Sequence, residues 1–131
     1  MDDVALLQSA TTIVLIDYPG REVPTAIVRA GYVVVSKEGP EPDDYREHVV
    51  EGDDVALRKV GKPPDHADIV YSHRPEEELP GIIELAQRIG ARAVWCETGS
   101  STARELVEAA GLIYVDSPQI ADAAQATVRR A

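Results

Sequence analysis

The chain has 131 residues and a formal net charge of −10, because 23 Asp and Glu outnumber 13 Lys and Arg. Such an acidic protein repels phosphate backbones and anionic lipid, so we expect neither nucleic acid nor a membrane as its partner. The single cysteine, Cys96, excludes an internal disulfide and a cysteine-built zinc site. No apolar run is long enough to span a bilayer, and the N-terminus is acidic where a secretory signal would be basic. We therefore expect a cytoplasmic protein with one domain over residues 1–131.

Short apolar runs rich in β-branched residues alternate with helical stretches along the chain. The runs are Thr12–Ile16, Tyr32–Val35, Ala67–Tyr71, Ala91–Trp95 and Leu112–Val115. Nearly continuous apolar strands are typical of a sheet that is covered on both faces. The alternation predicts an α/β fold: a doubly wound parallel sheet of about five or six strands with helices on both faces. We expect the strand order 3-2-1-4-5, with the last strand outermost.

The intervening segments predict five helices. These are Asp2–Ser9, a helix from Val23 or Pro24 to its cap at Gly31, Pro75–Ile89, Ser101–Ala110, and Pro118–Arg130 with Ser117 as the N-cap. Lys37–Pro42 has the composition of an exposed loop. The segment 43–65 has the weakest pattern and predicts at most one or two short edge strands, near His48–Val50 and Val55–Leu57.

Open α/β sheets bind ligands at the carboxyl ends of their strands, where the strand order reverses. The residues that follow the predicted strands are therefore the candidate binding residues. They are Asp17, Tyr18, Pro19, Gly20, Arg21, Ser36, Lys37, His73, Arg74, Glu97, Thr98, Gly99 and Ser100.

Each group of candidates has an alternative interpretation. Arg21 and the pair His73–Arg74 precede helices and would suit a phosphate. The first loop is equally consistent with a plain turn, and Arg74 with an ion pair to a glutamate of its own helix. The Ser and Thr residues after Glu97 suit a ligand or a helix cap equally well. Cys96 follows a strand, and we expect it to be buried and structural.

The sequence contains none of the motifs that carry common catalytic machinery. Gly-x-Ser-x-Gly, the Gly-x-x-x-x-Gly-Lys-Ser/Thr loop and His-Glu-x-x-His are all absent. His48 and His66 lie in poorly defined segments without the spacing of metal ligands. We therefore expect no catalytic residues and no metal site.

Several segments together resemble the small bacterial and archaeal CoA-binding proteins, whose Rossmann-like domain also occurs in succinyl-CoA synthetases. The segments cover most of the chain in order, and the most specific is Ile89-Gly90-Ala91-Arg92-Ala93-Val94-Trp95. The others are Gly31–Val35, Ala67–Val70 leading to Arg74-Pro75-Glu76, and Ala109–Asp116. The first loop diverges from the family pattern, because it is shorter and lacks the usual Gly-x-Ser. Glu97 and Ser117 also stand where the family usually has glutamine and cysteine.

The resemblance implies a Rossmann-like protein that holds CoA or an acyl-CoA across its strand ends without catalysis. The phosphate contacts would fall on Asp17–Arg21 and the adenosine contacts on Ser36 and Lys37. His73 and Arg74 would line the diphosphate or pantetheine cleft, which the turn from Glu97 to Ser100 would close. The alternative is a descendant of this fold that binds no ligand and serves as a protein-interaction module. Small α/β domains often pair isologously, so a homodimer is also expected.

Overall fold

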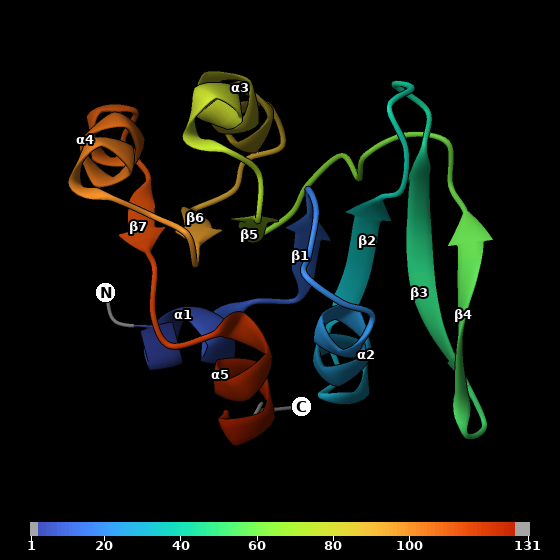
Figure 1. The fold of residues 1–131 in the computed structure, drawn as a ribbon. Coiled ribbons are helices and arrows are strands. Elements are labelled where there is room, and N and C mark those ends of the chain that lie inside the picture. Colours follow the sequence, from blue (N-terminus) through green and yellow to red (C-terminus); the bar gives the residue numbers. More distant parts are fainter. Residues whose placement is uncertain (1–2, 128–131) are drawn as a thin grey trace.

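The structure is a computed structural model that describes residues 3–127 and contains one seven-stranded sheet between two layers of helices (Figure 1). The strands are β1 Thr12–Leu15, β2 Val33–Lys37, β3 Tyr45–Glu51, β4 Asp54–Lys59, β5 Ile69–Ser72, β6 Ala93–Cys96 and β7 Ile113–Val115. The helices are α1 Asp3–Ser9, α2 Glu22–Arg29, the 3-10 turn η1 Glu76–Glu78, α3 Leu79–Arg88, α4 Ser101–Ala109 and α5 Ile120–Ala126. Within the described residues, no helix is both long and apolar enough to cross a membrane.

The strands lie in the order β4-β3-β2-β1-β5-β6-β7. β1 pairs in parallel with β2 on one side and with β5 on the other, and β6 and β7 continue the parallel part. β3 and β4 form an antiparallel hairpin on the outer edge of β2. The predicted fold class is confirmed, but the sheet is mixed rather than wholly parallel.

The predicted order of the five apolar runs is wrong. The third run, which contains β5, pairs with β1, so the five parallel strands have the order 2-1-3-4-5. The cause is the hairpin from the segment with the weakest pattern, because it occupies the outer edge of β2. The two short edge strands predicted there are present, and both are longer than expected.

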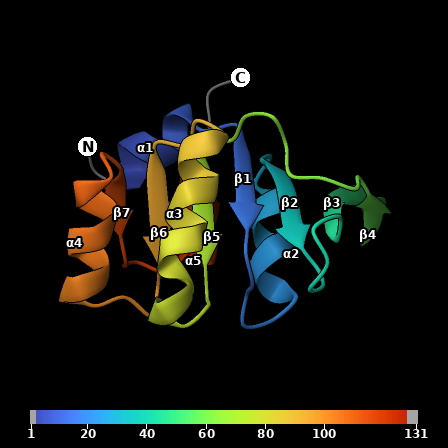
Figure 2. The ribbon, with the colours of Figure 1, turned by 90° about the horizontal axis from the view of Figure 1, so that it is seen from above.

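The alternation of side chains along the strands produces a separate core on each face of the sheet. Val14 faces the core beneath α3 and α4, whereas Ile13 and Leu15 face the core formed with α1, α2 and α5. All three side chains are fully buried. Figures 1 and 2 show α3 and α4 over the half of the sheet that contains β5, β6 and β7. The strands therefore have the buried, apolar character that the sequence pattern indicated.

Three of the predicted helices lie where expected. The helix predicted over Pro75–Ile89 opens as the 3-10 turn η1 and becomes α-helical at Leu79, and the last helix differs at its start. Helix α5 begins at Ile120, and Ser117 is not its N-cap. The backbone N–H of Ile120 instead donates to a carboxylate oxygen of Glu97, which takes the role that we assigned to the serine. The predicted end of this helix at Arg130 lies outside the described residues.

Asp68 ties the start of β1 to the start of β5. Its Oδ2 accepts the backbone N–H groups of Thr11 at 2.7 Å and Thr12 at 3.1 Å. Burial alone would raise the pKa of Asp68, but these hydrogen bonds and the charges of Arg92 and His66 lower it overall. The ionised carboxylate is thus part of the native structure.

We predict that Asp68→Asn lowers the free energy of unfolding at pH 7 by about 1–2 kcal/mol, because two amide donors lose a charged acceptor. The stabilisation by Asp68 is present above its unfolded pKa and is lost as the pH falls through its lower folded pKa. Denaturant unfolding between pH 7 and pH 2.5 should therefore show a weaker acid dependence in the variant. Asp65→Asn is the control, because the Asp65 side chain is 94% exposed. Equal stability of the two variants at pH 7 would contradict the assignment.

Candidate functional site

A cleft of about 620 Å³, here called the strand-end cleft, opens at the carboxyl ends of β1, β2 and β5. β1 lies between β2, the next strand in the chain, and β5, to which the chain returns after the hairpin. The cleft therefore lies where the strand order reverses. It is lined by Ile16, Asp17, Tyr18, Lys37, Glu38, Gly39, Pro40, Arg74 and Glu78.

Asp17 occupies an unusual backbone conformation directly after β1. Its φ is 134°, a value that side-chain-bearing residues rarely adopt and that costs on the order of 1–3 kcal/mol. The conformation places one carboxylate oxygen 2.9 Å from the backbone nitrogen of Tyr18, whose N–H it accepts. The other oxygen faces Arg74. The strained residue thus directs a negative charge into the strand-end cleft.

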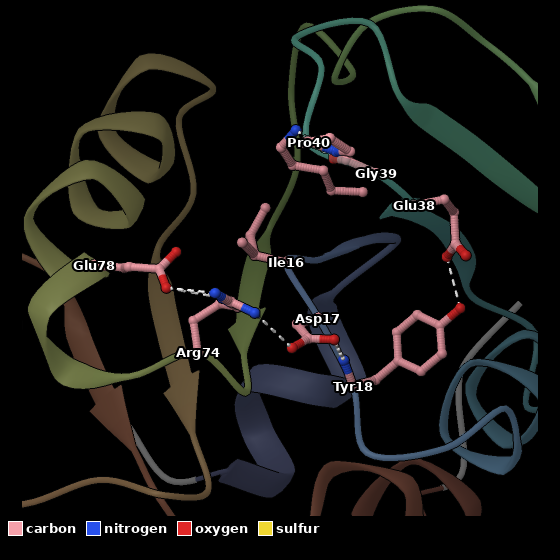
Figure 3. Close-up of a pocket in the computed structure, with 9 residues that line it drawn as sticks. Ile16, Asp17, Tyr18, Glu38, Gly39, Pro40, Arg74 and Glu78 are labelled. Atoms are coloured by element: carbon pink, nitrogen blue, oxygen red, sulfur yellow. Dashed lines mark hydrogen bonds and ion pairs between the residues drawn. The ribbon is translucent and has the colours of Figure 1, made fainter.

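Arg74 lies between two carboxylates at the end of β5. Its guanidinium donates to Glu78 at 3.0 and 2.6 Å and to Asp17 at 3.3 Å (Figure 3). Hydrogen bonds and charge from Glu78 and then Asp17 raise the pKa of Arg74 above its ordinary value. The side chain is 42% exposed, so solvent and ligands can still reach the guanidinium. The expected ion pair with a glutamate of the following helical segment is therefore present, together with a second acid.

The wall of the cleft at the end of β2 is a network around Glu38. Its Oε2 accepts the Tyr18 hydroxyl at 2.6 Å and also the Ser36 hydroxyl. Ser36 Oγ lies 2.8 Å from Nε2 of His48, which belongs to β3. Burial raises the pKa of Tyr18 to about 12, and Glu38 adds to the rise. Burial lowers the pKa of His48, which is 2% exposed.

The Ser36–His48 pair does not have the arrangement of a nucleophile and its base. Ser36 is fully buried, so a substrate cannot reach its hydroxyl. In a catalytic triad the acid orients the histidine through its second nitrogen. Here Glu38 contacts the serine, and the buried Nδ1 of His48 has no hydrogen-bonding partner in the described part of the chain. The pair instead fixes the Glu38 side chain, because Ser36 contacts His48 and donates its hydroxyl to the Glu38 carboxylate.

Lys37 lines the strand-end cleft but uses its ammonium group to close its own loop. Nζ donates to the carbonyl oxygens of Gly39 and Glu41, both at 2.8 Å, and lies 5.6 Å from the centre of the Tyr45 ring. The cation is therefore held by the β2–β3 loop.

The loop after β1 contributes less to the cleft than the sequence suggested. Pro19, Gly20 and Arg21 do not line it, and Arg21 is exposed at the N-terminus of α2. The carboxylate of Glu22 folds back over Gly20, so closely that a Cβ at Gly20 would collide with it. The protein thus places its own acid at the helix N-terminus where a phosphate loop would hold an anion.

The turn after β6 mainly supports the fold. Glu97 accepts the Tyr71 hydroxyl at 2.8 Å and the backbone N–H of Ile120, which fixes the start of α5. Ser100 caps α4 by accepting the N–H of Ala103 at 3.1 Å. Gly99 packs against the Tyr114 hydroxyl, which occupies the place of a Cβ. Of the two interpretations for the Ser and Thr residues, capping is therefore correct for Ser100.

The structure therefore brings four of the thirteen predicted residues together around the cleft: Asp17, Tyr18, Lys37 and Arg74. Thr98 and Gly99 border a separate cavity of about 20 Å³ beside Arg74. The remaining residues, Pro19, Gly20, Arg21, Ser36, His73, Glu97 and Ser100, do not line the strand-end cleft.

Sequence reasoning missed Glu38, Glu78 and His48. The i, i+4 spacing of Arg74 and Glu78 was a usable signal for this ion pair, although Arg74 precedes the helical segment and Glu78 lies in η1. Glu38 lay in a segment interpreted as an exposed loop. His48 was placed in a poorly defined segment but is buried in β3.

We predict that Cys96 reacts slowly with a thiol reagent at pH 7. The residue is 6% exposed, and burial, with a smaller contribution from Asp116, raises the pKa of its thiol to about 11. Labelling followed by absorbance should be slow in native protein and fast in denatured protein. The rate should be the same in His73→Ala. Fast native labelling that this variant abolishes would show instead that His73 activates the thiol.

Comparison with known proteins identifies the family of the chain. A family model described as a CoA binding domain matches residues 17–127, which include every residue lining the strand-end cleft except Ile16. No curated protein matches the chain. The family match covers most of the chain and confirms the resemblance found in the sequence, so the chain belongs to the CoA binding domain family.

Proposed function

We propose that this protein binds CoA or an acyl-CoA thioester in the strand-end cleft without catalysing a reaction on it. The observation that carries the proposal is the position of the cleft. In a chain of the CoA binding domain family, the carboxyl ends of β1, β2 and β5 surround an open cavity at the reversal of strand order.

The residues of the cleft fit the nucleotide part of such a ligand. Arg74 would hold a phosphate group, because a guanidinium forms charge-assisted hydrogen bonds with phosphate oxygens. Tyr18 and Glu38 offer an aromatic ring and a hydroxyl acceptor, and Ile16 and Pro40 add apolar surface. Bound CoA would supply a thiol that carries acyl groups as thioesters.

The charges in the cleft predict moderate affinity. Arg74 is already paired with Asp17 and Glu78, so a phosphate must compete with these carboxylates. The net charge of −10 adds repulsion at long range. Salt screens both the attraction to the exposed Arg74 and the long-range repulsion, so its two effects on binding oppose each other.

The open cleft supports ligand binding over the alternative of a ligand-free interaction module. For that alternative we would expect Tyr18 or Pro19 to fill the space beside Arg74. Tyr18 instead forms part of the wall, held by its hydrogen bond to Glu38, and Pro19 lies outside the cleft. The inaccessible Ser36 and the buried Cys96 support the non-catalytic part of the proposal.

We predict that calorimetry detects CoA binding and that Arg74→Ala weakens it by about twofold to fivefold, the range expected for an exposed ionic contact. Removal of Arg74 also leaves Asp17 and Glu78 unneutralised. Arg29→Ala is the charge-matched control, because Arg29 is at the C-terminal end of α2, outside the strand-end cleft, and donates a hydrogen bond to the hairpin carbonyl of Asp53.

The same titration with acetyl-CoA, ATP and NAD should establish the preferred ligand, after native mass spectrometry of the purified protein has tested for a retained one. An absence of heat and of thermal shift at millimolar CoA would refute CoA binding. Equal affinity of Arg74→Ala and Arg29→Ala would leave the ligand in place and refute the site.

A further inference from the structure

We infer that Glu38 determines nucleotide specificity: it selects adenosine nucleotides whose ribose hydroxyls are free over those with a phosphate on that ribose. The inference rests on the proposed function, because it requires an adenosine nucleotide in the strand-end cleft. It adds a ligand class, since CoA carries a ribose 3′-phosphate and 3′-dephospho-CoA does not.

The first support is the position of Glu38 in the sheet. It directly follows β2, the parallel neighbour of β1, and its side chain lines the cleft. In nucleotide-binding sheets of this type, an acid at this position accepts a hydrogen bond from the ribose 2′-hydroxyl, which neighbours the 3′ position that carries the phosphate in CoA. Figure 3 shows Glu38 beside Tyr18, with Asp17 between this pair and Arg74. A nucleotide with its phosphates at Arg74 would therefore place its ribose towards Glu38.

The second support is the way in which the carboxylate is held. Both hydroxyl contacts, from Tyr18 and Ser36, use Oε2. Oε1 has no hydrogen-bonding partner among residues 3–127, although the side chain is only 20% exposed. An ionised carboxylate can only accept hydrogen bonds. Oε1 is thus a fixed acceptor that suits a ligand hydroxyl and repels a phosphate.

The third support is the state of the cations. Lys37 and Arg74 are the cations that line the cleft in the described part of the chain. Lys37 is bound to the carbonyls of Gly39 and Glu41, and Arg74 is paired with two carboxylates. An additional phosphate beside Glu38 would therefore lack a free partner within the cleft. The charge of Arg21, which lies outside the cleft, also acts on Tyr18 and His48, so the experiment below includes it.

The test is a pair of calorimetric titrations with 3′-dephospho-CoA and CoA, which differ by one phosphate. We expect wild-type protein to bind 3′-dephospho-CoA about tenfold more tightly or better, because like charges in contact are strongly disfavoured. Glu38→Gln keeps the size of the side chain and removes its charge, and it should bring the two affinities within about threefold of each other. Glu41→Gln removes a charge from the same loop outside the cleft and should retain the full preference.

Tyr18→Phe provides a second variant that does not depend on the stability of Glu38→Gln. It removes a hydroxyl donor but leaves the carboxylate, so the preference for 3′-dephospho-CoA should persist. Because the readout is a ratio of affinities, a fraction of inactive protein does not change it.

The possible failures are distinguishable. Wild-type protein that binds CoA as tightly as 3′-dephospho-CoA, or more tightly, would overturn the role of Glu38 and leave the proposed function intact. If Arg21→Ala then weakened CoA alone, Arg21 would be the residue that holds the ribose phosphate. Absence of binding by both ligands would refute the proposed function and the inference together.

Discussion

The parallel pairing of β1 with two neighbours is the constraint on which the rest of the molecule depends. β1 has only four residues, yet it is hydrogen-bonded along both edges and buried on both faces. The two neighbours, β2 and β5, lie on opposite sides of β1, so the chain segments that follow the three strands diverge at their carboxyl ends. This divergence leaves a space at the strand ends that side chains from three different segments surround.

The charges in that space are balanced by the protein itself. Arg74 would be an unpaired cation facing solvent if Asp17 and Glu78 were absent, and its pairing gives it a defined position without a ligand. The strained backbone at Asp17 contributes to this arrangement, since it directs the carboxylate towards the guanidinium. This pairing lowers the affinity for an anionic ligand, because the ligand must replace the carboxylates that already contact Arg74.

The fold could be predicted from the sequence where local patterns decide it. The strands around Val14, Val70 and Val94 are short and apolar throughout, which indicates strands buried on both faces. The position of the third parallel strand could not be predicted in this way. It depends on which edge of β2 the hairpin occupies, and that is a pairing between residues far apart in the chain.

The candidate site was predictable to the same extent. Asp17 and Arg74 follow from the rule that strand ends meet at one edge of a sheet. Glu97 and Ser100 follow the same rule, but they serve helix N-termini, because polar residues at strand-to-helix turns satisfy exposed amides as readily as they bind ligands. Glu38 could not be assigned from the sequence. Its side chain accepts the Ser36 hydroxyl, and only the register of the hairpin places His48 of β3 against Ser36.

The hairpin also contains one part that should tolerate insertions and another that should not. Its tip, at Gly52 and Asp53, is exposed, so added or deleted residues there would leave the strand pairing intact. A single-residue insertion within the first half of β3 would have a different effect, because it would turn His48 to the opposite face of the sheet. The Ser36 hydroxyl would then lose its support from β3. The chemical character of one wall of the cleft therefore depends on the register of β3, a strand between β2 and β4 that contributes no residue to the lining of the cleft.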